Sequence, residues 1–509
     1  MSQKHIAVIG AGPGGLTAAM ILARRGFKIS VFEKESEVGG RNAAIRLGGF
    51  VFDTGPTFLM MKYILDEMFE EAGQKTENWL KIVKLDPMYR LKFDDVEINV
   101  TDDHERMKAE IEKWFPGQSS NLDRFFEKEG IRFKKLFPCL QKDYSDWTQF
   151  LRPAFLRGGP YMYTFDTIFE HLGNYFGPEK LRLSFTFQSK YLGMSAWECP
   201  GAFVIIPYIE HSFGIWHPIG GLSEISAAMA KVLKKLGGEI HLNAPVDKVI
   251  TDGQIAKGLK LKDGSRIEAD EVVVNADFGY AMTHLFEPGV IRKWSEGNLR
   301  KKRFSCSTFM LYLGLNKVYD HPHHAIYFAG AYRENVEDIF NRMRLSDDMS
   351  FYVRNASLTD PTIAPQGKSA LYILVPVANN RSGIDWEKEK KIYRDKVLSA
   401  VARKTGMSDL PEHIEVEKVI TPADWENQYH VYKGATFNLA HNIGQMLYFR
   451  PRNRFEEVDR CWLVGGGTHP GSGLPTIYES GRITANLICK KYGVPFVYPN
   501  QAYGKNPKL

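Results

Sequence analysis

The chain has 509 residues, of which 44% are hydrophobic and 25% charged, and its formal net charge is +6. The length is enough for about three domains, and the composition is that of a globular protein. It excludes a disordered chain, a collagen-like repeat and a small disulfide-stapled fold. The slight basic excess is spread along the whole chain, so we expect no nucleic acid as a partner.

The cysteine and hydropathy patterns indicate the compartment. The five cysteines are widely spaced and form no CxxC pair or Cys/His set at metal-ligand spacing, so we expect inert thiols in a reducing compartment. His321, His323 and His324 lack a carboxylate or cysteine partner at ligand spacing, and no metal site is expected. Neither a signal peptide nor a run of about 18 apolar residues is found. The sequence therefore predicts a cytoplasmic protein, with contact to a membrane surface left open.

A strand, a glycine-rich turn and a helix are predicted within the first 25 residues. The apolar run 5–9 is followed by Gly10-Ala11-Gly12-Pro13-Gly14-Gly15 and by a helix-forming stretch from Leu16 to Arg25. A second strand, 28–33, ends at Glu33, 23 residues after Gly10. This spacing predicts a dinucleotide-binding βαβ unit, with a pyrophosphate against the glycines and Glu33 accepting a hydrogen bond from the adenosine ribose. The unit alone does not distinguish NAD from FAD.

Further segments contribute to the same predicted domain. Residues 34–41 end in Gly39-Gly40-Arg41, and residues 50–57 are typical of a strand followed by a proline turn. Residues 220–276 predict a glycine turn, a helix at 222–236, a strand after Gly237, an alternating strand pair around Asp263-Gly264 and a strand at 271–276. Near the other end of the chain, a strand at 461–464 enters the glycine turn 465–467, and a helix is predicted from about 476 to 492.

These segments together resemble the bacterial and fungal type of phytoene desaturase and its carotenoid-desaturase relatives, which are FAD enzymes. The resemblance covers nearly the whole chain and is carried by GAGPGG at 10–15, PIGG at 218–221, FRPRNR at 449–454 and GGGTHPGSGLP at 465–475. It implies FAD as the cofactor. The residues expected to hold it are Gly10, Gly12, Gly14, Gly15, Glu33, Lys34, Gly40, Arg41, Thr57, Val246, Gly466, Gly467, Gly473 and Leu474.

The expected fold class is α/β. A Rossmann-like FAD-binding domain of the glutathione reductase or amine oxidase type is interleaved with a mixed α+β substrate domain and a helical, membrane-contacting subdomain. The predicted boundaries are 1–60, 217–300 and 451–495 for the FAD-binding domain, 61–130 and 301–450 for the substrate-binding domain, and 131–216 for the helical subdomain.

Two stretches of the helical subdomain carry distinct patterns. Between Ile131 and Arg157, six basic residues stand against two acidic ones and alternate with six aromatic residues. This pattern suits an interfacial segment on an anionic bilayer, which would make the protein peripheral and monotopic. The alternative is a helical cap whose aromatic side chains face its own core. The apolar run 201–209 is either a buried helix or the wall of a substrate tunnel.

The resemblance implies desaturation of a long polyene isoprenoid, phytoene or a related carotenoid precursor, by hydride transfer to the flavin and proton loss. Dioxygen or a membrane quinone would then accept the electrons. Left open are a related carotenoid isomerase, saturase or terminal-methyl oxygenase, a non-catalytic membrane-associated FAD protein, and an amine or porphyrinogen oxidase. Because positioning dominates such a reaction, few catalytic residues are expected. The candidates are His469, Tyr478 and Glu479, with Glu479 as the proton acceptor. The alternative is that all three only pack or form local hydrogen bonds.

Overall fold

Five parallel strands from distant parts of the chain form one sheet in the computed structural model, which describes residues 3–162 and 165–496. In spatial order the strands are β19 (Cys461–Leu463), β13 (Glu271–Val274), β1 (His5–Ile9), β2 (Lys28–Phe32) and β9 (Glu239–His241). Val8 of β1 lies opposite Val273 on one side and Val31 on the other. The central strands are continuous apolar runs because both faces of the sheet are buried.

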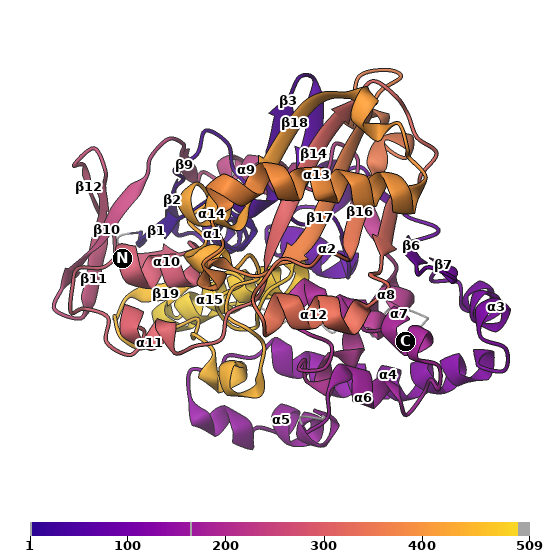
Figure 1. Ribbon diagram of the computed structural model, residues 1–509. Helices are drawn as coiled ribbons and strands as arrows, with labels where there is room; N and C mark the ends of the chain where they lie inside the picture. Colours follow the sequence, from indigo (N-terminus) through magenta and orange to yellow (C-terminus); the bar gives the residue numbers. More distant parts are fainter. Residues whose placement is uncertain (1–2, 163–164, 497–509) are drawn as a thin grey trace.

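Helices cover one face of this sheet, and a small second sheet covers the other (Figure 1). Ile6 and Val8 share a core with the helices α1 (Pro13–Arg24), α9 (Ser223–Lys235) and α15 (Leu474–Tyr492). Ala7 and Ile9 face α10 (Phe278–His284) and the antiparallel strands β10 (Val246–Asp252), β11 (Ile255–Leu261) and β12 (Arg266–Glu268). Helix α1 begins at Pro13, where a missing amide removes no hydrogen bond within the helix.

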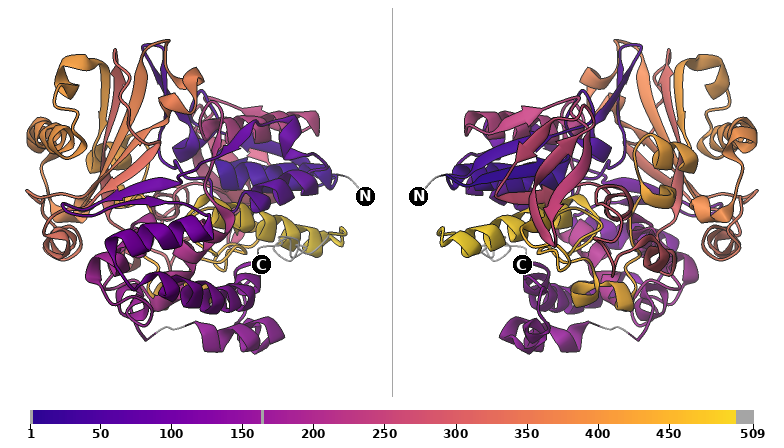
Figure 2. Two further views of the ribbon diagram at one scale, coloured as in Figure 1. Left: turned by 90° about the vertical axis from the view of Figure 1, so that its right-hand side faces the viewer. Right: turned by 90° about the vertical axis from the view of Figure 1, so that its left-hand side faces the viewer.

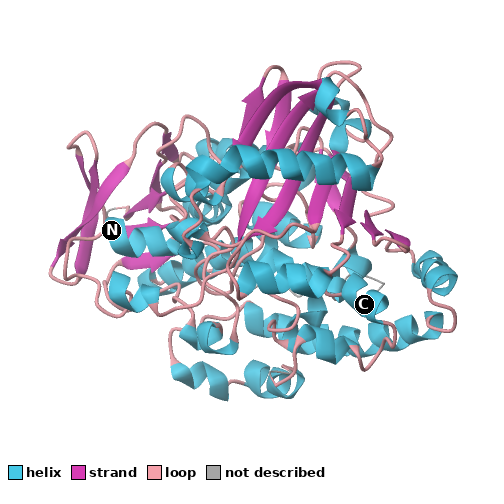
Figure 3. Ribbon diagram, viewed as in Figure 1, coloured by secondary structure: helices cyan, strands magenta, loops and turns pink. Residues whose placement is uncertain are grey.

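A seven-stranded sheet forms the second half of the molecule. Its spatial order is β18 (Ile414–Ile420), β14 (Ser307–Leu315), β17 (Ser369–Val377), β16 (Phe351–Asn355), β15 (His324–Tyr327), β6 (Tyr89–Lys92) and β7 (Glu97–Val100). All pairs are antiparallel except β15 with β6. Helix α13 (Trp386–Thr405) crosses one face of this sheet (Figure 3). Its Tyr393 and Val397 share a core with Phe309. The other face carries Met310 and Tyr372 toward the hairpin β3 (Ala44–Leu47) and β4 (Phe50–Asp53).

A group of helices lies below the two sheets as drawn, and it is seen from both sides in Figure 2. These helices are α3 (His104–Trp114), α4 (Ser119–Leu140), α5 (Pro153–Gly158), α6 (Ile168–Leu172), α7 (Glu179–Ser184), α8 (Ile205–Phe213) and α12 (Tyr332–Phe340). The remaining helices and strands are α2 (Lys62–Glu71), α11 (Glu296–Arg300), α14 (Pro422–Asn427), β5 (Ile82–Lys84) and β8 (Trp216–Pro218). None of the helices within the described ranges is long and apolar enough to cross a bilayer.

The structure confirms the α/β fold with a parallel sheet, and the predicted elements of that part differ from the observed ones mainly at their ends. Helix α1 begins at Pro13 rather than Leu16, and α15 begins at Leu474 rather than near Thr476. The strand expected at 28–33 ends at Phe32, so Glu33 begins the loop that follows. The five parallel strands come from residues 5–32, 239–274 and 461–463. The predicted domain boundaries themselves stay predictions.

In the segment 131–157 some of the aromatic and basic side chains are buried and others are exposed. Phe133 and Phe137 on α4 are buried, as is Tyr144 beyond its end, so part of the aromatic set faces the core. Arg132 is buried too and forms a 2.9 Å ion pair with Glu129. Other side chains of the segment are exposed, among them Lys134, Lys135, Trp147, Leu151, Arg152 and Leu156.

The apolar run 201–209 is helical. A 3₁₀ turn, Gly201–Val204, leads directly into α8, and Val204, Ile205, Tyr208 and Ile209 are buried. Tyr208 of this run packs its ring 5.7 Å from that of Phe133 on α4. No residue of the run is among those that line the large cavity described below, so the buried-helix interpretation fits the structure better than a tunnel wall.

Candidate functional site

One cavity of about 870 Å³ extends from the glycine turn after β1 to the inner face of the seven-stranded sheet. At one end it is lined by the residues that connect the parallel strands to α1 and α15. At the other end apolar and aromatic side chains form the wall, namely Phe58, Phe187, Tyr191, Met310, Ile326, Phe328, Tyr332, Tyr352 and Leu374. A polar end joined to an apolar end is the layout expected when a cofactor and an apolar substrate meet.

The turn between β1 and α1 requires glycine at specific positions. Gly10 has φ +89°, a conformation that favours glycine, and a Cβ on Gly15 would lie 2.4 Å from the carbonyl oxygen of Gly10. Gly12 caps α1 without any side chain and lines the cavity together with Gly14. The free amides at the start of α1 therefore face a glycine-lined space, which is the arrangement that binds a pyrophosphate.

Glu33 is held in place directly after β2. The amide of Ala11 donates to its Oε2 at 2.8 Å and the amide of Glu35 to its Oε1 at 3.1 Å. Burial raises the pKa of this carboxyl group above its usual value. Each carboxylate oxygen can accept two hydrogen bonds and accepts one here, so both keep one acceptor position, and Glu33 lines the cavity. Lys34 beside it also lines the cavity and donates to the carbonyl of Gln428 at 3.0 Å.

Arg41 spans the middle of the polar end. Its Nη1 donates to the carbonyl of Thr436 at 2.8 Å and lies 3.9 Å from Oδ2 of Asp277. Asp277 caps α10 through the amide of Tyr280, and burial raises the pKa of its carboxyl group. Both Arg41 and Asp277 line the cavity, so a guanidinium with unused donors is available to a phosphate.

The turn between β19 and α15 closes the polar end from the other side. Gly466, Gly467, Gly473 and Leu474 line the cavity there. A Cβ on Gly467 would lie 2.5 Å from the Cβ of Phe278, so a side chain is excluded. All the residues predicted to hold the cofactor line this one cavity except Gly15, whose place is in the contact between α1 and the β1 turn.

The sequence reasoning missed one wall of the polar end. Residues 428–431 and 436–438, within the predicted substrate domain, also line the cavity, and Phe437 and Asn438 lie against the turn after β19. Thr436 Oγ1 and Asn438 Oδ1 are buried there without a hydrogen-bond partner in the described part of the chain. Buried polar atoms of this kind call for a polar ligand. Together with the α1 amides and Glu33, they fit the pyrophosphate, ribose and ring edges of FAD. No local motif in this stretch marks that role.

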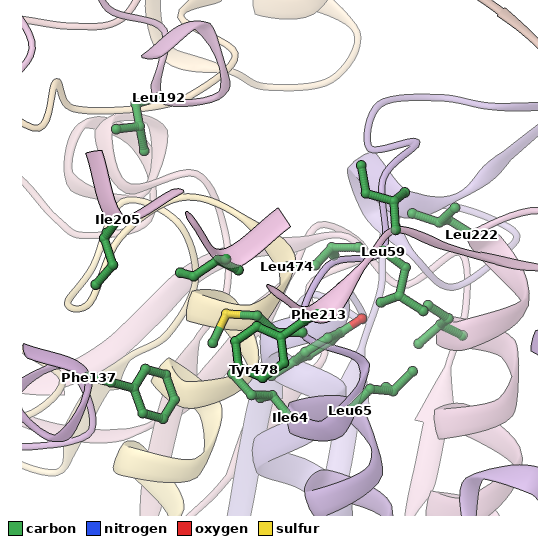
Figure 4. Close-up of a cluster of buried hydrophobic side chains, with 14 of the residues drawn as sticks. Leu59, Ile64, Leu65, Phe137, Leu192, Ile205, Phe213, Leu222, Leu474 and Tyr478 are labelled. Atoms are coloured by element: carbon green, nitrogen blue, oxygen red, sulfur yellow. The ribbon is translucent and has the colours of Figure 1, made fainter. Parts of the chain in front are cut away.

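The predicted catalytic residues are close to the turn after β19, but none of the three is among the residues that line the cavity. Tyr478 is 1% exposed and lies in the apolar core near Ile64 and Phe213 (Figure 4). His469 Nε2 lies 2.8 Å from the carbonyl oxygen of Lys142, and burial lowers the His469 pKa to about 3. Glu479 is buried against Arg482 and accepts a 3.0 Å hydrogen bond from Gln141. Their catalytic role stays a prediction, and this placement argues for the local packing alternative.

The apolar end contains a group of hydrogen-bonded polar side chains that the sequence did not reveal. The hydroxyl of Tyr352 donates to Thr57 Oγ1 at 2.9 Å and lies 2.6 Å from Nδ1 of His324. Phe58 stacks on the His324 ring at 4.2 Å. Burial lowers the pKa of His324 well below its usual value, so this histidine is neutral. Thr57, Phe58 and Tyr352 therefore form an uncharged part of the wall, and Thr57 is also one of the residues expected to hold the cofactor.

A buried carboxyl group lies behind the same wall. Glu210 on α8 is fully buried, and its Oε2 accepts hydrogen bonds from Gln188 at 2.7 Å and Tyr89 at 3.0 Å. Burial raises its pKa to about 7.

Within the described residues, no three Cys, His, Asp or Glu side chains gather closely enough to hold a metal ion. The five cysteines are free and buried.

Comparison with known proteins decides between the cofactors. Residues 13–489 match the family described as flavin-containing amine oxidoreductases. The chain belongs to this family. A 4,4'-diapophytoene desaturase (4,4'-diapolycopene-forming) of Methylomonas sp is 54% identical over 495 residues, which cover 97% of each chain. An all-trans-zeta-carotene desaturase of Myxococcus xanthus is 38% identical over 97% of this chain and 94% of its own.

Solved structures agree on the fold. A putrescine oxidase variant superimposes with a TM-score of 0.62 over 96% of this chain and 99% of its own, at 15% identity. A likeness at that identity shows the fold alone. The family and its desaturase members make the chain an FAD-dependent oxidoreductase of the desaturase type.

Proposed function

We propose that this enzyme desaturates a long isoprenoid hydrocarbon, a carotenoid precursor such as phytoene or its shorter diapo relative. The observation that carries the proposal is the continuity of the cavity, which joins the FAD residues to a wall of apolar and aromatic side chains. The names of the relatives support it, since they are a diapophytoene desaturase and a zeta-carotene desaturase. The apolar lining suits a polyene better than a small polar substrate.

The residues of this chain contribute mainly by positioning and by excluding water. Bound FAD would supply the two-electron oxidation, accepting hydride from an allylic carbon. The α1 amides, Glu33 and Arg41 would hold its adenosine and pyrophosphate, while Thr57 and the turn 466–474 would hold the ring. Phe58, Tyr191 and Tyr352 would keep the polyene against that ring in a dry space, where a correctly held allylic C–H needs little further assistance.

His469, Tyr478 and Glu479 take a supporting part in this proposal. Glu479 and Arg482 anchor α15, and His469 ties the turn after β19 to the carbonyl of Lys142. These contacts fix the backbone of Gly466, Gly467 and Leu474, which do line the cavity. We propose that the three side chains set the shape of the flavin end without touching the polyene.

We further propose that the substrate is taken from a membrane surface by the segment 131–157. Trp147, Leu151 and Leu156 are 60%, 61% and 60% exposed, close in sequence to the exposed Lys134, Lys135 and Arg152. Large apolar side chains among cations suit the headgroup region of an anionic bilayer. A hydrocarbon of this kind is insoluble in water, so a peripheral enzyme gains direct access to it there. Dioxygen or a membrane quinone would accept the electrons.

The proposed function is tested by supplying the FAD-loaded enzyme with polyenes in liposomes and following their absorption spectra. Each new conjugated double bond shifts the spectrum to longer wavelength, so stepwise red shifts are expected with a hydrocarbon precursor. An unchanged hydrocarbon spectrum together with turnover of an amine would contradict the proposal and favour the amine oxidase alternative.

A further inference from the structure

A lysine nitrogen is buried in the apolar wall of the cavity. Lys190 belongs to the 3₁₀ segment Phe187–Leu192, between α7 and α8, and it lines the cavity. Its Nζ is buried and has no hydrogen-bond partner among the described residues. It lies 4.9 Å from the ring centroid of Tyr332. Burial lowers the pKa of Lys190 to about 8, an effect partly opposed by Cys306.

The surroundings do not compensate for this burial. The neighbouring wall residues are Phe187, Tyr191, Cys306, Phe328 and Tyr332, and none of them forms a hydrogen bond or ion pair with Nζ. A cation–π contact with Tyr332 offsets only part of the desolvation of an ammonium group. Buried lysines without an acceptor are rare in proteins unless a ligand supplies one.

A pure hydrocarbon cannot supply that acceptor. It would cover Nζ with more apolar surface, and the N–H groups of Lys190 would still have no hydrogen-bond acceptor. A polyene that ends in a carbonyl group brings an oxygen with free lone pairs, while the rest of its chain still packs against the aromatic wall. Because Lys190 lines the cavity together with Phe187, Tyr191 and Tyr332, an oxygen bound to it would lie among side chains suited to the polyene.

We propose that Lys190 binds a terminal carbonyl oxygen of the polyene, so that the cavity accepts chains ending in an aldehyde or a carboxylate in addition to the hydrocarbon. This inference rests on the proposed function insofar as that function makes the cavity a polyene site. It adds a second ligand class and a residue that selects it.

The test measures binding to the FAD-loaded enzyme in detergent micelles by quenching of tryptophan fluorescence. Three polyenes of matched length are compared: a hydrocarbon, the corresponding aldehyde and the corresponding carboxylic acid. Wild type should bind the aldehyde and the acid at least 10-fold more tightly than the hydrocarbon. Lys190→Met should lose this preference and keep its affinity for the hydrocarbon within about 2-fold, because the methionine stem replaces the lysine stem in the wall.

Two further variants keep the result interpretable. Lys190→Gln, which retains a neutral N–H donor, should keep part of the aldehyde preference and lose the acid preference. Lys388→Met, at a lysine whose side chain is 81% exposed on α13, should behave as wild type. FAD content and melting temperature confirm that each variant is folded.

The proposal is overturned if wild type binds all three polyenes equally, or if Lys190→Met keeps the preference. It is also overturned if Lys190→Met binds every polyene as wild type does but no longer oxidises the hydrocarbon, since that result would make Lys190 a proton acceptor. Hydrocarbon desaturation by wild type is measured separately, so a failure of the proposed function is recognised independently.

Discussion

Arg482 and Glu479 form a buried ion pair one turn apart on α15, and both side chains are almost inaccessible to solvent. Nε of Arg482 donates to Oε2 of Glu479 at 3.0 Å, while Nη1 reaches Glu67 on α2 at 2.6 Å. Burial alone would lower the pKa of Arg482, but the carboxylates around it raise it above its usual value. The pair therefore ties α15, and with it the turn that lines the flavin end, to α2.

Replacing Glu479 by Gln should lower stability more than it alters chemistry. The variant leaves the Arg482 charge with Glu67 and Glu71 alone, and breaking a buried pair costs about 3–5 kcal/mol. We expect the lower end of that range in urea unfolding of the FAD-loaded enzyme. Glu387→Gln at the exposed start of α13 is a control that should change little. A changed distribution of desaturated products at unchanged stability would show that Glu479 contacts the polyene.

Glu33→Ala should weaken FAD binding without unfolding the sheet. The variant removes the acceptor offered to the ribose, a hydrogen bond to a charged group worth about 1.5–3 kcal/mol. The FAD dissociation constant, measured by flavin fluorescence, should rise by about 10- to 150-fold. Glu239→Ala, at a carboxylate 58% exposed on β9, should leave it unchanged. If both variants bind FAD as wild type does, Glu33 does not contact the cofactor.

Glu210 should make stability depend on pH. Its pKa rises on folding from an ordinary 4.5 to about 7, so the native state holds the proton more tightly than the unfolded chain. The resulting stability is fully present below pH 4.5 and is lost as the pH rises through 7. Glu210→Gln, which imitates the protonated acid, should therefore gain about 3 kcal/mol relative to wild type between pH 4.5 and 8. Parallel stability curves for the two proteins across this range would contradict the assignment.

Reversing three exposed charges should reduce membrane binding. Replacing Lys134, Lys135 and Arg152 with Glu removes cations that each contribute about 1 kcal/mol near an anionic surface. Sedimentation with anionic liposomes at low salt should show at least a 100-fold weaker association. As a control, Lys388 and Lys391 are changed to Glu on α13, which lies across the seven-stranded sheet in Figure 1, away from α5 at the bottom. Equal association of wild type and the triple variant would return the segment 131–157 to a purely structural role.

The sequence predicted residues of the polar half of the cavity because these residues lie close together in the chain. Gly10, Gly12 and Glu33 lie within one βαβ unit, where backbone conformation and spacing determine what the turn binds. The apolar half is assembled from residues far apart in the chain, and Thr57, His324 and Tyr352 show no pattern that predicts their contact.

The catalytic candidates also depended on side-chain directions that the sequence does not show. Glu479 and Tyr478 follow the GGGTHPGSGLP segment directly, so proximity in sequence suggested proximity to the flavin. A helix turns about 100° per residue, however, and after Leu474 and Ile477 face the cavity the next two side chains point into the core and toward Arg482. Lys190 and Glu210 were missed because burial, which gives them their altered pKa values, cannot be read from a single sequence.

Desaturation of a hydrocarbon by this enzyme is tested most directly by the reduction of its bound flavin under anaerobic conditions. The FAD-loaded enzyme is mixed with a carotenoid-precursor hydrocarbon in liposomes, without dioxygen or quinone, and the visible flavin band is followed alongside the polyene spectrum. We expect the flavin to be bleached in a single turnover, with one conjugated double bond gained per flavin reduced. Flavin that stays oxidised with the hydrocarbon, but is bleached when an amine is added, would contradict the proposed desaturation.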